Sequence, residues 1–117
     1  MGMDLLSEHG DERFNARGWR WCLERAKEFG WSPEGTVAPI DFQGEWNGDY
    51  FTNDYQTVTD RDARALGEAL LRAVAALSAR EPDKIHMDEF AAAEFDGELS
   101  CLRRLANYAL KGGFVIA

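Results

Sequence analysis

The chain of 117 residues lacks a hydrophobic run that could cross a membrane. A membrane-spanning helix needs about 18 or more largely apolar residues in a row, and the longest near-apolar run, from Ala73 to Leu77, is far shorter. The N-terminus carries acidic residues and lacks the basic segment that opens a secretory signal. We therefore expect a cytoplasmic protein, outside any membrane, in which residues 1–117 form one compact domain.

Cysteine and histidine are scarce, with two residues of each. Cys22 and Cys101 belong to no C-x-x-C motif, so in a reducing compartment we expect free thiols that pack as small hydrophobic side chains rather than a disulfide. His9 and His86 have no zinc-ligand spacing to the cysteines, and there is no H-E-x-x-H motif. We therefore predict no zinc site.

Common catalytic motifs are missing as well. There is no G-x-G-x-x-G, no Walker-type loop and no G-x-S-x-G around any serine. Glu45 and Asp54 could act as paired carboxylates, but such pairs arise by chance among 21 acidic residues. A Cys101–His86 pair stays open, although nothing else in the sequence supports it. We predict a non-catalytic protein without a cofactor, and keep an enzyme with an unrecognised site as an alternative.

Basic residues are absent between Trp31 and Asp60, and the whole chain has a formal net charge of −8. This charge argues against binding to nucleic acid, which requires a basic surface. The acids of the stretch also lack EF-hand spacing, whether counted from Asp49, Asp54 or Asp60, so we expect no calcium or other metal site. The acids are Glu34, Asp41, Glu45, Asp49, Asp54 and Asp60.

Two long helices are predicted from apolar residues at 3.6-residue spacing. The first covers residues 15–30. The second begins with Thr59 as its cap and ends before Pro82, because a proline disfavours helical geometry in the preceding residue. Asp60 and Asp62 lie in its first turn, where the helix dipole favours negative charge.

The C-terminal third predicts one or two further helices. Residues 98–111 are apolar on two sides, which is typical of a central helix, and Gly112 and Gly113 would end it. A short helix could cover the segment that begins at Asp88, with a break at Asp96–Gly97 before the next helix. The last four residues, FVIA, have the composition of a strand.

The stretch between Trp31 and Val58 predicts a β-hairpin, because it has no helical period and Asn47–Gly48 favours a two-residue turn. Pairing around this turn would separate polar from apolar side chains, and the C-terminal strand could join the sheet. The predicted fold is therefore α+β, mainly helical with three to four helices and a small antiparallel hairpin or sheet. The residues expected on the apolar, buried face are Ile40, Phe42, Trp46 and Phe51.

Phe14 and Trp21 lie close together on nearly the opposite side of the first predicted helix from its main apolar stripe. A second element could cover both side chains, or they could form an exposed aromatic pair that meets a partner or a second copy of the chain. The sequence leaves monomer and homodimer open.

Three segments resemble a family of small bacterial proteins of unknown activity. They are W-x-G-x-Y-x-x-N-D-x-Q-x-V from Trp46 to Val58, D-A-x-x-L-x-x-A-L from Asp62, and G-G-F-x-I from Gly112. The resemblance covers about half of the chain and implies a shared fold, but no catalytic residue. Members often have glycine where this chain has Tyr55, and glycine would ease a positive φ at that position.

The candidate binding site is the acidic and aromatic cluster that runs from the predicted turn to the second helix. Aromatic residues dominate interface hot spots, and acids attract a cationic partner. We predict a small acidic protein-binding module for a cationic protein; an antitoxin- or immunity-like inhibitor of a basic toxin is one form of it. Alternatively, the tryptophan is core and the acids are only a solvated surface. The candidate residues are Glu45, Asp49, Tyr50, Asn53, Asp54, Tyr55 and Gln56.

Overall fold

The computed structural model describes residues 2–79 and 89–117, and within them it has an α+β fold, as predicted. Pro82, His86 and Asp88, and with them the predictions made for these positions, lie outside the described residues. No helix of the described part is long and apolar enough to cross a membrane. The elements in chain order are β1 (Gly2–Ser7), β2 (Gly10–Asn15), α1 (Ala16–Glu28), β3 (Gln56–Val58), α2 (Asp60–Ala79), α3 (Glu89–Leu110) and β4 (Phe114–Ile116).

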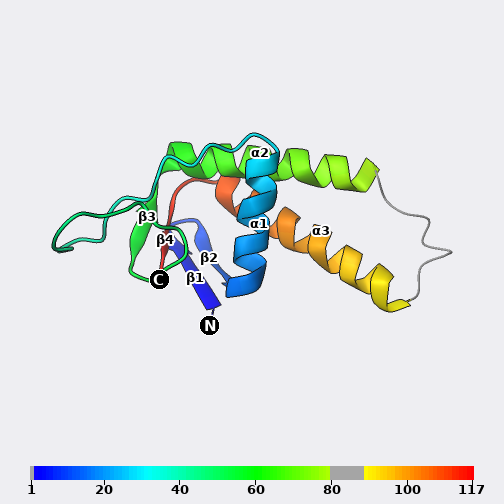
Figure 1. Ribbon diagram of the computed structural model, residues 1–117, viewed down its shortest axis with the longest axis horizontal. Helices are drawn as coiled ribbons and strands as arrows, with labels where there is room; N and C mark the ends of the chain where they lie inside the picture. Colours follow the sequence, from blue (N-terminus) through cyan, green and yellow to red (C-terminus); the bar gives the residue numbers. More distant parts are fainter. Residues whose placement is uncertain (1, 80–88) are drawn as a thin grey trace.

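The four strands form one antiparallel sheet in the order β2-β1-β4-β3. The C-terminal strand β4 therefore lies inside the sheet, where it pairs with β1 through Leu5 and Ile116 and with β3 through Val58 and Phe114. Figure 1 shows the helices gathered on one side of this sheet, with both chain ends close to it. The C-terminal strand predicted from FVIA is confirmed.

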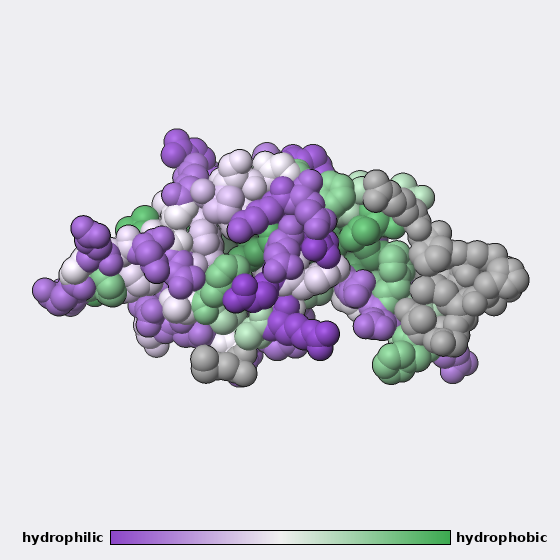
Figure 2. Space-filling model, in the orientation of Figure 1, coloured by the Kyte–Doolittle hydropathy of each residue, from purple (hydrophilic) through white to green (hydrophobic). Residues whose placement is uncertain are grey.

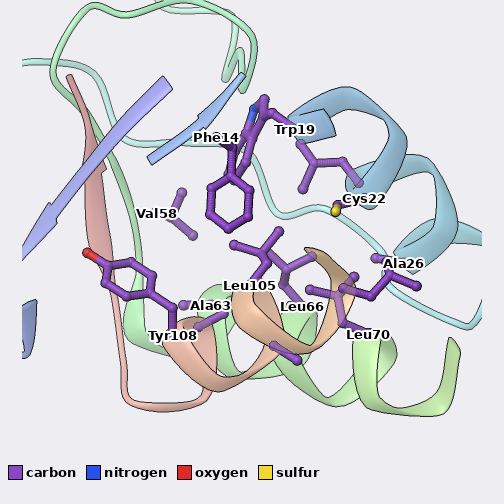
Figure 3. Close-up of a cluster of buried hydrophobic side chains, with 14 of the residues drawn as sticks. Phe14, Trp19, Cys22, Ala26, Val58, Ala63, Leu66, Leu70, Leu105 and Tyr108 are labelled. Carbon is purple, nitrogen blue, oxygen red and sulfur yellow. The ribbon is translucent and has the colours of Figure 1, made fainter. Parts of the chain in front are cut away.

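The core lies between the sheet and the three helices. Met3, Leu5 and Phe14 point into it from β1 and β2, and Trp19 of α1 is fully buried among them. Figure 3 shows side chains from the strands, α1, α2 and α3 converging on this cluster. On the opposite face of the sheet the side chains are exposed or half-exposed; they include Asp4, Leu6, Thr57 and Val115.

The helices α1 and α2 form where the sequence predicts them. The Asn15 side chain caps α1 by accepting a hydrogen bond from the Gly18 amide at 2.6 Å. The Thr59 hydroxyl caps α2 in the same way, accepting from the Asp62 amide at 3.2 Å. The buried stripes are those of the predicted apolar spacing, because each amphipathic helix turns one face to the core.

The predicted break at Asp96–Gly97 is wrong, because α3 is one continuous helix from Glu89 to Leu110. Gly97 is exposed, and a side chain added there would meet no atom within 4 Å. A glycine at an exposed site weakens a helix by about 1 kcal/mol but does not end it. Residues on both apolar sides of the C-terminal half of α3 are buried, which agrees with its expected central place; they are Leu99, Leu102, Leu105, Ala106, Tyr108 and Ala109.

The β1–β2 hairpin was not expected from the sequence. Leu5 and Leu6 are adjacent, so the alternation of apolar and polar residues that predicts a strand is broken, and only Leu5 faces the core. Phe14 belongs to β2 rather than to the first helix and is 2% exposed. It is therefore covered by the core. Trp21, its predicted partner on the surface, is only partly buried.

The hairpin predicted around Asn47–Gly48 is wrong. Residues 29–55 form a long loop between α1 and β3, hereafter the α1–β3 loop, whose one sheet-like contact is a bridge from Val37 to Thr57. Ile40 is 93% exposed instead of buried, and Phe51 lies at the surface beneath the Arg20 guanidinium. Of the four predicted core residues, Phe42 is also exposed and Trp46 is only half-buried.

Two helical glycines give a direct test of the helix packing. A Cβ added to Gly67 of α2 would lie 2.8 Å from Leu110 Cγ of α3, whereas one added to Gly97 would meet nothing. We expect Gly67→Ala to destabilise the protein by about 1–3 kcal/mol, since the two helices must move apart. We expect Gly97→Ala to stabilise it by about 0.5–1 kcal/mol. Urea unfolding measures both; equal effects of the two substitutions would contradict this packing.

Candidate functional site

The α1–β3 loop contains six of the seven predicted site residues. Figure 1 shows it leaving α1, projecting beyond the sheet and returning to β3. Because the loop has no strand ladder, its backbone groups and its position depend on side-chain hydrogen bonds. Three groups of such bonds hold it, and they decide which predicted residues face solvent.

The first group centres on Asp62, whose side chain is fully buried in the first turn of α2. Its carboxylate accepts hydrogen bonds from Trp31 Nε1 at 3.0 Å and from the Tyr50 hydroxyl at 2.5 Å. The two rings meet edge to face with centroids 5.3 Å apart. The Tyr50 hydroxyl also accepts from the Gly35 amide at 2.9 Å. Asp62 therefore fixes both ends of the loop to α2.

The second group joins the outgoing and returning halves of the loop. Trp46 Nε1 donates to the Thr36 hydroxyl at 3.0 Å, and that hydroxyl donates to the Asp49 carbonyl at 2.7 Å. The halves approach so closely at Gly48 that an added Cβ would lie 3.1 Å from Gly35 Cα. Gly48 also has a φ of 75°, which glycine adopts without strain. The W-x-G part of the motif is thus explained by loop packing.

The third group seats the end of the loop on the sheet. Gln56 is fully buried, and its amide donates to the carbonyls of Asp49 and Thr52 at 3.1 and 2.7 Å. Asn53 Nδ2 donates to the carbonyls of Gly2 and Ala117 at 2.8 and 2.9 Å. The polar side chains of Tyr50, Asn53 and Gln56 are therefore engaged inside the protein and are not directed toward a ligand.

Asp49, Glu45 and Asp54 differ in what their carboxylates contact. Asp49 Oδ1 accepts a hydrogen bond from the Phe51 amide at 2.7 Å, so it has a role in the local turn. Glu45 and Asp54 are exposed. No Lys or Arg lies between Trp31 and Asp60 to balance their charge within the loop.

Tyr55 occupies a special position. It has a φ of 67°, its amide donates to the Ile116 carbonyl at 2.8 Å, and it is 64% exposed. Glycine adopts a positive φ without strain, whereas a residue with a side chain does not. A non-glycine residue in this conformation costs about 1–2 kcal/mol.

Two clefts meet at the Tyr55 side chain. One, of about 460 Å³, lies between the loop and the sheet and is lined by Ile40, Asp54, Tyr55 and Val115 together with Ala38, Pro39 and Thr57. The other, of about 690 Å³, opens over β1 and β2 and has a mixed charge, since three acids and two arginines line it with Tyr55; the charged residues are Asp4, Asp11, Glu12, Arg13 and Arg104. The structure thus brings Asp54 and Tyr55 together, whereas Glu45 does not line either cleft.

Several apolar side chains beside these clefts are exposed. Val37 is 51% and Ile40 93% exposed, and Phe42, at 42%, stacks edge to face on Trp46. Figure 2 shows that the projecting loop is mostly hydrophilic on the visible face, with a small hydrophobic patch. The surface around Tyr55 therefore combines acids with apolar side chains. We call Ile40, Asp54, Tyr55 and Val115 the Tyr55 surface.

Glu45 and Asp54, the paired carboxylates considered from the sequence, do not line a common cleft at Tyr55. Of the Cys101–His86 pair, His86 lies outside the described residues. His9 lines another cleft, of about 680 Å³, near the ends of α2 and α3. Within residues 2–79 and 89–117, no group of three His, Cys, Asp or Glu side chains could hold a metal ion.

Comparisons of the chain with known protein families, with curated proteins and with solved structures found no match. The resemblance to a family of small bacterial proteins therefore stays a prediction.

Sequence reasoning missed the central role of Asp62 and the exposure of Ile40. Asp62 was explained as a helix-start residue, yet it stands one turn before Leu66 on the buried side of α2. An acid at that spacing needs a buried partner, and this was the available signal. For Ile40 the sequence carries no such signal, because its exposure follows from the path of the whole loop.

Removal of the Asp62 carboxylate tests the anchor. Asp62→Ala leaves the Trp31 indole and the Tyr50 hydroxyl without their buried partner, so we expect a loss of about 3 kcal/mol of unfolding free energy. The exposed Asp54→Ala should change it by less than about 0.5 kcal/mol. Urea unfolding measures both variants. If Asp62→Ala left the free energy of unfolding unchanged, contacts other than those of Asp62 would hold the loop.

Alkaline pH should loosen the same anchor. Burial, together with the hydrogen bond to Asp62, raises the pKa of Tyr50 above its ordinary value. As the pH rises, the unfolded chain therefore loses the Tyr50 proton before the folded protein does. The contribution of Tyr50 to the free energy of unfolding is fully present below about pH 10 and falls above it by up to about 1.4 kcal/mol per pH unit. Unfolding of the protein and of Tyr50→Phe across this range measures the effect. Parallel pH profiles of the two proteins would contradict it.

Proposed function

We propose that this protein is a non-catalytic binding module that docks a basic segment of a partner protein on the Tyr55 surface. The observation that carries the proposal is the exposed aromatic ring of Tyr55, held in a left-handed backbone conformation where two clefts meet. Strained backbone at an exposed residue is concentrated at functional sites in proteins.

The strain at Tyr55 gives the proposal its first support. Glycine would adopt the positive φ at this position without strain. The hydrogen bond from the backbone amide of residue 55 to the Ile116 carbonyl does not involve the side chain, so glycine could also make it. The tyrosine ring is 64% exposed, so most of it lies in solvent rather than in the core. A contact with a partner would explain it, since tyrosine is among the residues that dominate interface hot spots.

Charge gives the second support and determines the kind of partner. Asp54 lies in the same cleft as Tyr55, and Asp41 and Glu45 are exposed on the same loop, which contains no basic residue. Acids around an aromatic anchor attract lysine or arginine side chains and speed association at low salt. Arginine fits best, because its guanidinium stacks on a tyrosine ring and pairs with a carboxylate.

Inhibition of a basic toxin, in the manner of an antitoxin or immunity protein, would be one use of such a module. Small size and acidity, with the surface described above, support that version. In this version the partner loses its activity when bound.

Tyr55→Gly separates binding from folding. We expect this variant to be more stable by about 1 kcal/mol, because the backbone strain is relieved, and yet to lose binding. Tyr55→Phe keeps the strain and the ring and should bind. Binding is measured on arrays of short arginine-containing peptides and a panel of basic proteins. A stabilised Tyr55→Gly that binds as tightly as the natural chain would overturn the proposed role of the ring.

Charge reversal tests the electrostatic part. We expect Glu45→Lys combined with Asp54→Lys to weaken binding and to remove most of its salt dependence, since the attraction for a cationic segment is lost. Glu24→Lys with Glu68→Lys changes the net charge equally but on exposed positions of α1 and α2, and serves as the control. If both double variants bind alike, only overall charge matters and the Tyr55 surface is not the site.

A further inference from the structure

Two cysteine side chains from distant parts of the chain meet between α1 and α3. Cys22 Sγ and Cys101 Sγ lie 3.3 Å apart, and both residues are free thiols. No sequence pattern pairs them, since they are 79 positions apart and share no motif. A disulfide has a sulfur–sulfur length of about 2.04 Å, so only a small side-chain movement separates the pair from bonding.

The two thiols differ in their access to solvent. Cys22 is fully buried and belongs to the core cluster, as Figure 3 shows. Cys101 is half-buried and lines a cleft of about 510 Å³ with Asn15, Gly18 and Trp21. The backbone of α1 passes close to this thiol at Gly18, where an added Cβ would lie 3.7 Å from Cys101 Sγ. A small reagent can therefore reach Cys101, but not Cys22.

The surroundings of Cys101 also favour its thiolate. The hydrogen bond from Cys22, together with the nearby Arg104 guanidinium, lowers the pKa of Cys101 to about 7 in spite of partial burial. Arg104 is held in place by an ion pair with Glu12 at 3.0 Å and by a hydrogen bond to the Arg13 carbonyl at 2.8 Å. The hydrogen bond with Cys101 and burial raise the pKa of Cys22.

We propose that Cys22 and Cys101 form a peroxide-sensitive dithiol, in which Cys101 is the attacking and Cys22 the resolving thiol. This site is independent of the proposed partner binding at the Tyr55 surface. In the cytoplasm expected from the sequence the pair would rest as two thiols and be oxidised transiently.

The chemistry needs a hydroperoxide and nothing further. The Cys101 thiolate attacks one peroxide oxygen; a sulfur–oxygen bond forms, the oxygen–oxygen bond breaks, and the other oxygen leaves as an alcohol, or as water from hydrogen peroxide, after taking up a proton. Cys22 Sγ then attacks Cys101 Sγ; the disulfide forms, the sulfur–oxygen bond breaks, and water leaves with the Cys22 proton. Two thiols lose two electrons and the peroxide gains them.

The disulfide would connect α1 to α3 and so close a loop of the chain that contains β3 and α2. Closing so long a loop restricts the unfolded chain and therefore stabilises the oxidised protein. We expect its urea midpoint to lie above that of the reduced protein, and the shift to disappear on reduction.

The decisive experiment treats the reduced full chain with hydrogen peroxide. We expect both thiols to disappear together, the intact mass to fall by two hydrogen atoms, and peptide mapping to link Cys22 to Cys101 within a monomer. Two surviving thiols, a sulfenic or sulfinic acid on Cys101 that never becomes a disulfide, or disulfides only between chains would each overturn the proposal.

Variants assign the two roles. In Cys22→Ser, Cys101 should give a sulfenic acid that dimedone traps, and in Cys101→Ser the buried Cys22 should survive the same treatment. Ser100→Cys combined with Cys101→Ser moves the thiol to the neighbouring exposed position and should abolish the internal disulfide. An internal disulfide in this control would show that a thiol at a neighbouring position of α3 reacts equally well, and that the placement of Cys101 against Cys22 is not required.

Iodoacetamide gives a test on the natural chain that needs no substitution. Cys101 should react first, with a rate midpoint near pH 7, and Cys22 only after unfolding. Equal reactivity of both thiols in the folded protein would contradict the assignment of the attacking and resolving roles.

Discussion

The hydrogen bonds to the buried carboxylate of Asp62 are the interactions on which the position of the α1–β3 loop depends. It receives the Trp31 indole at one end of the α1–β3 loop and the Tyr50 hydroxyl near the other. Each of these groups would be costly to bury alone, by about 1–3 kcal/mol, and together they satisfy one another. A long loop without a strand ladder is thereby held on α2, and its remaining side chains are free to face solvent.

Helices were largely predictable from the sequence and the loop was not, for one physical reason. The stripes of α1 and α2 repeat over many turns, and Asn15 and Thr59 cap them locally, so the evidence for each helix lies within its own segment. The path of the loop depends on contacts with residues far away in sequence, such as Asn53 with Gly2 and Ala117. At Asn47–Gly48 there are no paired strands, and the Asn47 side chain instead accepts a hydrogen bond from the Asp49 amide at 3.0 Å.

Burial divides the candidate residues into two classes, and their role in binding stays a prediction. Tyr50, Asn53 and Gln56 hold the loop through hydrogen bonds. Asp54 and Tyr55 lie between them in sequence but face outward, which composition alone cannot distinguish. The positive φ at Tyr55 could not be predicted from composition or periodicity, because it follows from how the loop joins the sheet beside Ile116.

The position of β4 inside the sheet has a consequence for the order of folding. The β1–β2 hairpin closes locally, whereas the Leu5–Ile116 pair joins the first strand to the last and must overcome the entropy of closing nearly the whole chain. We expect the helices to form and pack first and β4 to insert between β1 and β3 afterwards. The sheet is then completed late, and this step sets the folding rate. Because β3 follows the α1–β3 loop directly, the Tyr55 surface would become ordered only in this last step.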